Sequence, residues 1–171
     1  MSSITILQKG ITDIPAGAIV NAANSGLWAG GGVCGAIFRR AGYDKLTAAC
    51  NAIGHCPEGS AVITPGFDCP CKFIIHAVGP RYVDGRHGEP ESLYGAYAKS
   101  LELCRQNEIH SVVFPLISAG IFDYPLRAAW EVAARACKDF LAANPGYDLD
   151  IIFAIPEAEK VRVGQEILAK A

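Results

Sequence analysis

Residues 18–37 read AIVNAANSGLWAGGGVCGAI, a β-branched run that leads through a glycine-rich loop into a segment of helical period. Apolar side chains recur at every fourth position from Val33, and Gly42 supplies a C-terminal stop after two arginines. We therefore predict a strand over 18–21 and a helix that spans about 31–41. Strand, loop and helix in this order form the repeating unit of α/β domains.

The same alternation continues along the whole chain, without a low-complexity linker or an internal repeat. Strands are expected at 4–8, 18–21, 61–64, 73–78, 111–114 and 149–155. Further helical patterns run through 46–53, 93–104, 130–141 and 161–168. Several strands are unbroken apolar runs, as expected when helices cover both faces of a sheet. These patterns predict one domain over residues 1–171, a three-layer α/β/α sandwich of Rossmann-like type around six strands.

The composition narrows the classes of function. Of 171 residues, 51% are hydrophobic and 19% are charged, so intrinsic disorder and a charged interaction tail are disfavoured. The formal net charge of −2 provides no general basic field, which disfavours nucleic acid as a partner. Any anion that the protein binds must therefore be held by local groups.

The cysteines and the N-terminus indicate a cytoplasmic protein. Seven cysteines are an odd number, and several fall within apolar helical segments, as expected of reduced thiols. His55, Cys56, Cys69 and Cys71 are the nearest approach to a metal cluster, but Cys-x-Cys around Pro70 is not a usual zinc spacing, and we expect no metal and no cofactor. We expect no export signal and no membrane span, because no apolar run approaches about eighteen residues.

The first loop has the composition of a phosphate site. Gly30, Gly31 and Gly32 stand directly before the predicted helix, where bare backbone amides and the partial positive charge of a helix N-terminus favour a phosphate or diphosphate. A flexible connecting loop is the alternative.

Gly30-x-Gly32-x-x-Gly35 also matches the dinucleotide fingerprint of nicotinamide dehydrogenases. That fingerprint needs its glycines directly after the strand and an acidic residue at the end of a second strand. Here eight residues separate Asn21 from Gly30, and a second helical pattern follows. A nucleoside triphosphatase is equally unsupported, because the sequence has no phosphate-binding Gly-x-x-x-x-Gly-Lys-Ser/Thr segment.

A second loop follows the strand that is expected to end at Phe114, and residues 115–125 read PLISAGIFDYP. Its small residues Ser118 to Gly120 offer amides for a second anion contact. Phe122 and Tyr124 are candidates to cover a sugar or a base, with a place in the core as the alternative.

Together, the two loops resemble the macro domain family, whose members bind ADP-ribose and related nucleotides. The matching landmarks occur in the order VNAAN at 20–24, GGGV at 30–33, GAI at 35–37, AG at 41–42, HAVGP at 76–80 and PLISAGIF at 115–122. The resemblance covers nearly the whole chain. It implies a mixed six-stranded sheet between helices, with ADP-ribose in a cleft between the loops.

The resemblance also implies a set of ligand-binding residues. These are Gly10, Ile11, Ala22, Asn24, Gly30, Gly31, Gly32, Val33, Ser118, Ala119, Gly120, Ile121, Phe122 and Ile155. Residues 31–33 would line the distal ribose and the diphosphate, and 118–122 would hold the diphosphate from the other side. Asn24 would bond the distal ribose hydroxyls, because an amide both donates and accepts. Asn21 could have a structural role instead of a ligand-binding one, and tie the loop to the sheet.

Two departures from the family pattern concern the base. The acid that is expected to accept a hydrogen bond from the adenine amino group is replaced by Gly10, so base recognition is weakened or Asp13 reaches in. The aromatic residue that often covers adenine is replaced by Ile155, which offers apolar contact without a π face.

Three residues are candidates for catalysis: Asn24, Asp123 and Cys34. The hydrolase branch usually carries an acid at the position of Cys34, which is here either a nucleophile with a lowered pKa or a small packing residue. Asp123 either orients water or favours the next helix N-terminus. His76, inside an apolar strand, is expected to be a core residue. Water would be held by Asn24 and the substrate phosphate, or activated by Asp123.

The resemblance thus implies a protein that binds ADP-ribose and hydrolyses ADP-ribosyl esters or O-acetyl-ADP-ribose without a metal. The alternative is a non-catalytic reader of ADP-ribosylated proteins or of free ADP-ribose. The expected partner is ADP-ribose or an ADP-ribosylated protein, with no membrane and an open oligomeric state.

Overall fold

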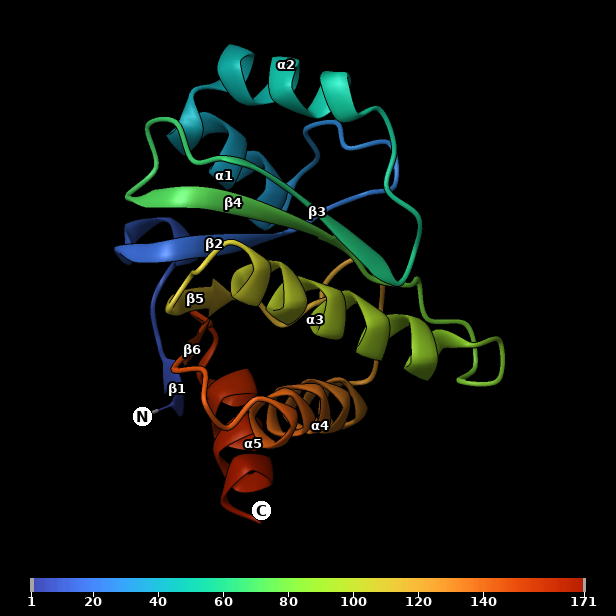
Figure 1. Cartoon of the computed structure of the whole chain (residues 1–171). Helices are drawn as coiled ribbons and strands as arrows, with labels where there is room; N and C mark the ends of the chain where they lie inside the picture. Colours follow the sequence, from blue (N-terminus) through green and yellow to red (C-terminus); the bar gives the residue numbers. More distant parts are fainter. Residues whose placement is uncertain (1, 171) are drawn as a thin grey trace.

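The computed structural model describes residues 2–170 and shows one mixed six-stranded sheet between two layers of helices (Figure 1). The strands are β1 Ser3–Leu7, β2 Ala16–Ala22, β3 Ser60–Pro65, β4 Cys71–Val78, β5 Ser111–Phe114 and β6 Asp150–Ala154. They lie in the order β1-β6-β5-β2-β4-β3, and every neighbouring pair is parallel except β3 with β4. The predicted three-layer sandwich with a mixed sheet is therefore confirmed.

The helices divide between the two faces of the sheet. They are α1 Gly32–Ala41, α2 Tyr43–Ile53, α3 Glu89–Gln106, α4 Leu126–Ala143 and α5 Ala158–Ala169, with a short 3-10 turn, η1, at Ile11–Asp13. Helices α1 and α2 cover one face, and α3, α4 and α5 cover the other (Figure 1). Among the helices described, none is both long and apolar enough to cross a membrane.

The core beneath α3, α4 and α5 is built around Trp130, which is fully buried. Its ring lies 5.0 Å from that of Phe153 on β6, and its indole Nε1–H donates to the backbone oxygen of Lys160, at 2.8 Å. Gly164 of α5 packs so closely on this indole that a Cβ there would lie 2.5 Å from ring atoms. These contacts hold α5 against α4 in one register.

A polar chain crosses the other core, between β2, β4 and β3. Asn21 and His76 are cross-strand partners, and the Asn21 Nδ2 donates to Nδ1 of the imidazole at 3.1 Å. The other ring nitrogen, Nε2, lies 3.0 Å from Oγ1 of Thr64. Neutral imidazole satisfies both contacts, with Nε2–H as the donor to Thr64. His76 is therefore a core residue, as predicted, and Asn21 ties β2 to β4.

Burial lowers the pKa of His76 to about 4, which makes the stability of the fold depend on pH. In the unfolded chain the imidazole titrates near about 6.5, so the unfolded state binds more protons between the two values. The contribution of about 3 kcal/mol is complete above that range and is lost as the pH falls through it.

We expect the free energy of unfolding to drop by about 2 kcal/mol between pH 7.5 and pH 5 because of His76 alone. Urea titrations of the wild type and of His76→Gln measure this. The variant should be less stable at neutral pH but should show a shallower dependence on pH. A variant with the full wild-type slope would contradict the assignment.

Candidate functional site

A cavity of about 380 Å³ opens at the carboxyl ends of the parallel strands, between the two predicted loops. It is lined by residues that follow β2, β4, β5 and β6 and by the first turns of α1 and α5. Ligands bind in α/β sheets at such edges. Of the predicted ligand-binding residues, those that line the cavity are Ala22, Asn24, Gly30, Gly31, Gly32, Val33, Ser118, Gly120, Ile121, Phe122 and Ile155.

Glycine is required at different positions of the first loop for different structural reasons. Gly32 opens α1 with φ +55, a left-handed conformation that favours glycine. A Cβ on Gly31 or Gly32 would meet no atom within 4 Å, so both leave the helix N-terminus open towards the cavity. Gly35 instead faces the loop, because a Cβ there would lie 2.6 Å from the backbone oxygen of Gly30. The bare amides stand where a diphosphate can approach them.

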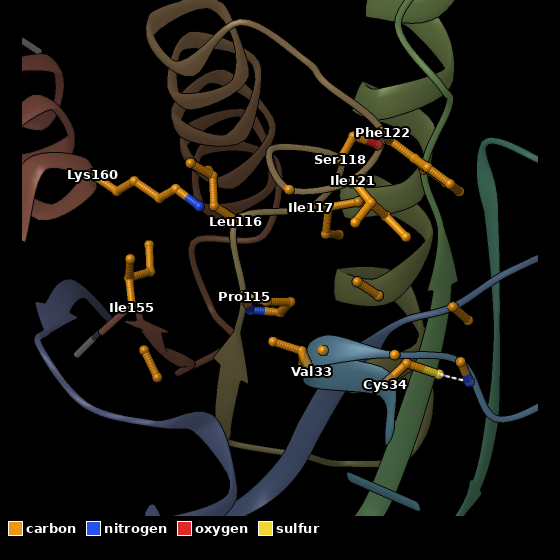
Figure 2. Close-up of a pocket in the computed structure, with 18 of the residues that line it drawn as sticks. Val33, Cys34, Pro115, Leu116, Ile117, Ser118, Ile121, Phe122, Ile155 and Lys160 are labelled. Atoms are coloured by element: carbon orange, nitrogen blue, oxygen red, sulfur yellow. Dashed lines mark hydrogen bonds between the residues drawn. The ribbon is translucent and has the colours of Figure 1, made fainter. Parts of the chain in front are cut away.

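Cys34 anchors this loop from the first turn of α1. Its buried sulfur accepts a hydrogen bond from the Gly30 N–H at 3.4 Å, shown in Figure 2, and donates towards the Trp28 oxygen at 3.8 Å. The thiol lines the cavity while it is engaged with the loop. This geometry supports the packing alternative for Cys34.

The half-buried Asn24 clamps the same loop. Its Nδ2 donates to the Trp28 oxygen at 2.9 Å, and its Oδ1 accepts from the Trp28 N–H at 3.1 Å. An amide has two N–H groups and two lone pairs on oxygen, so one donor and one acceptor site remain for a ligand. Asn24 lines the cavity and can therefore serve both the loop and a bound diol.

The second loop is held in place by contacts with residues 80–82. Ser118 adopts φ +67 and is buried, and its hydroxyl donates to the Pro80 oxygen at 2.7 Å. The oxygen of Phe122 accepts from the Tyr82 N–H at 2.8 Å, and the Arg81 guanidinium lies 5.0 Å from the Phe122 ring. Phe122 thus contacts this cation and also lines the cavity.

Three predictions on this loop need correction or qualification. Tyr124 is 4% exposed and packs in the core, so it does not cover a ligand. Asp123, exposed at φ +60 and three positions before α4, is not among the lining residues, and neither is Ala119. Asp123 therefore follows a lining residue, Phe122, without lining the cavity itself.

The end of the cavity next to Ile155 differs most from the prediction. Gly10 and Ile11 do not line it; Ile11 is buried in the core with α1, and Asp13 is exposed beside Gly10. Sequence reasoning missed Lys160, whose side chain extends from α5 towards Leu116 (Figure 2). The sequence signal that could have identified Lys160 is a basic residue soon after the end of the last strand.

Within residues 2–170, one group of side chains has metal-ligand geometry: Asp84, His87 and Glu89, outside the cavity. Burial of Glu89 opposes its ionisation, but four backbone N–H groups of residues 83–87 donate to its carboxylate and lower its pKa. Its oxygens are therefore already occupied. Glu89 organises the loop that packs on Phe122 through Tyr82.

The fold and the cleft define an α/β domain in which two glycine-containing loops line one cavity at the carboxyl ends of the parallel strands. The chain belongs to the macro domain family, whose family model matches residues 20–133. It is 40% identical over 173 residues to an O-acetyl-ADP-ribose deacetylase of Escherichia fergusonii, covering 99% of this chain and 97% of the relative. It is 46% identical over 143 residues to a macro domain-containing protein of Xanthomonas axonopodis, covering 80% and 79%.

Solved structures agree with this assignment. An Oceanobacillus iheyensis macrodomain with ADP superposes with a TM-score of 0.90 at 34% identity, covering 96% of this chain and 89% of that one. A Trypanosoma brucei macrodomain in complex with ADP-ribose gives 0.88 at 31% identity, covering 95% and 68%.

Proposed function

We propose that the protein binds ADP-ribose in this cleft and hydrolyses O-acetyl-ADP-ribose, or ADP-ribosyl esters of acidic side chains, without a metal ion. The observation that supports this proposal most strongly is the pair of open glycine loops, around Gly32 and Gly120, that face one cavity from opposite sides. Their backbone amides suit a diphosphate and explain how a chain of net charge −2 holds an anion. The family relatives support the same ligand.

The lining residues restrict the catalytic route. Among them, Glu157 is the sole carboxylate, and it follows Ile155 in the segment between β6 and α5. Asp123 does not line the cavity, and Cys34 is bound to the loop. We therefore favour a water molecule positioned by Asn24 and a phosphate oxygen of the substrate. That oxygen takes a proton from the water as it attacks the ester carbonyl. The bond between the carbonyl carbon and the ribose oxygen then breaks, and the same proton passes to the leaving ribose oxygen, which yields free acid and ADP-ribose.

A non-catalytic reader is the second candidate, and the observation that favours it is the thiol at position 34. Incubation with O-acetyl-ADP-ribose and with a protein mono-ADP-ribosylated on acidic residues separates the two. A hydrolase releases acetate or ADP-ribose at an unchanged rate in the presence of EDTA. A reader binds both substrates and releases nothing.

The Cys34→Ser variant tests the route. Serine keeps a donor and an acceptor beside Gly30 but removes the thiolate nucleophile. We expect turnover to change by less than about threefold, because the thiol serves the loop. A loss of about a hundredfold in a variant that still binds ADP-ribose would show thiolate catalysis and contradict the route.

A further inference from the structure

Lys160 is the single cationic side chain among the cavity-lining residues within 2–170. It lies in the first turn of α5, and its side chain is 28% exposed. Its ion-pair partner is Glu157, with 3.9 Å between Nζ and Oε1, at the outer limit of such a contact. The ammonium therefore stands in the cavity without a close counter-charge.

The position of Lys160 is fixed by the core. Its backbone oxygen accepts from the Trp130 indole, and Gly164, one turn further along α5, packs against the same ring. This anchoring directs the side chain from α5 across the cavity towards Leu116 (Figure 2).

The side chains around Lys160 leave its ammonium group without a close anionic partner. Apart from Glu157, the walls at this end of the cavity are the apolar residues Leu116, Ile155 and Pro156. The two amide loops that suit the diphosphate extend further along the cavity (Figure 2). A partly buried cation next to apolar walls is unfavourable unless an anion offsets it. The adenine base is neutral, and the distal ribose lies at the Asn24 end. The adenosine ribose is the remaining part of the ligand that can carry a charged group here.

We propose that Lys160 is a specificity-determining residue that selects an ADP-ribose carrying an additional phosphate on its adenosine ribose. The inference rests on the proposed function and on the expectation that Ile155 contacts adenine, which together put the adenosine half of ADP-ribose at the Ile155 end. The lysine leaves Glu157 and pairs with this phosphate, an ion pair that the neutral backbone amides of the two loops cannot form. Ligands with a bare adenosine ribose bind the same cleft more weakly.

Calorimetric titrations with ADP-ribose and with ADP-ribose 2′-phosphate test this in the wild type, in Lys160→Gln and in Lys99→Gln. Lys99 is exposed on α3 and does not line the cavity, so its variant is the charge-matched control. The wild type and the control should prefer the 2′-phosphate by about tenfold, and Lys160→Gln should lose this preference. Rising salt should weaken the preference. Glu157→Gln should strengthen it, because a competing carboxylate is removed.

The outcomes separate the two proposals. Equal affinities of the wild type for the two ligands would overturn the selectivity and leave ADP-ribose binding intact. An equal loss for both ligands in Lys160→Gln would place the lysine on the shared diphosphate and also overturn it. If the wild type binds neither ligand, the proposed function itself fails.

Discussion

Gly120→Glu is expected to weaken ADP-ribose binding by at least about a hundredfold in a protein that keeps its fold, because like charges placed together cost several kcal/mol. A Cβ on Gly120 meets no atom within 4 Å and projects from a residue that lines the cavity. The new carboxylate can therefore enter the cavity without displacing protein atoms, where it meets the diphosphate. Gly120 has no positive φ, whereas Gly32 has φ +55, so the substitution at Gly120 avoids backbone strain.

Calorimetry measures the affinity, and circular dichroism with thermal melting checks the fold. Gly146→Glu is the matched control, because Gly146 is exposed, has open space around it and does not line the cavity. It should bind ADP-ribose like the wild type. Unchanged affinity in a folded Gly120→Glu protein would show that the diphosphate does not lie against the second loop.

Asn24→Ala is expected to lower the turnover of O-acetyl-ADP-ribose by about a hundredfold and its affinity for ADP-ribose by less than about tenfold. The reason is that orientation of the distal ribose and its water matters more in the transition state than in the bound ground state. The donor and acceptor that Trp28 leaves free on Asn24 are the groups that would perform this orientation.

The loop clamp is the competing explanation for any effect of Asn24→Ala, since the variant also loses both bonds to Trp28. Single-turnover rates and ADP-ribose affinities from the same preparation distinguish the two. Equal losses in rate and affinity would assign Asn24 to the loop alone and contradict its catalytic role.

Local sequence patterns predicted the order of strands and helices, because each pattern depends only on residues that are close together in the sequence. Buried parallel strands such as β4 and β5 are covered on both faces and show as unbroken apolar runs. The two loops were identifiable because glycines at a helix N-terminus and small residues after a strand have a direct physical reason. Strand ends were less accurate, and β2 begins at Ala16 rather than at residue 18.

The rest of the site depends on contacts between distant segments. Lys160 faces the cavity because Trp130 and Gly164 set the register of α5. The sequence shows a basic residue soon after the last strand, but it does not show this register. Tyr124 is buried in the core and Asp123 is not among the lining residues, in a loop that passes through a left-handed residue at Ser118 and another at Asp123.

All seven cysteines are free thiols, as expected from the sequence. The cytoplasmic location stays a prediction.

Titration of the wild-type protein with ADP-ribose tests the central claim most directly. We predict one site per chain, much weaker binding of free phosphate or adenine, and a stabilisation of about 2.7 kcal/mol at a hundred times the Kd. This stabilisation should raise the Tm by about 5 °C or more. Absence of both binding heat and a Tm shift at millimolar ADP-ribose would contradict the account.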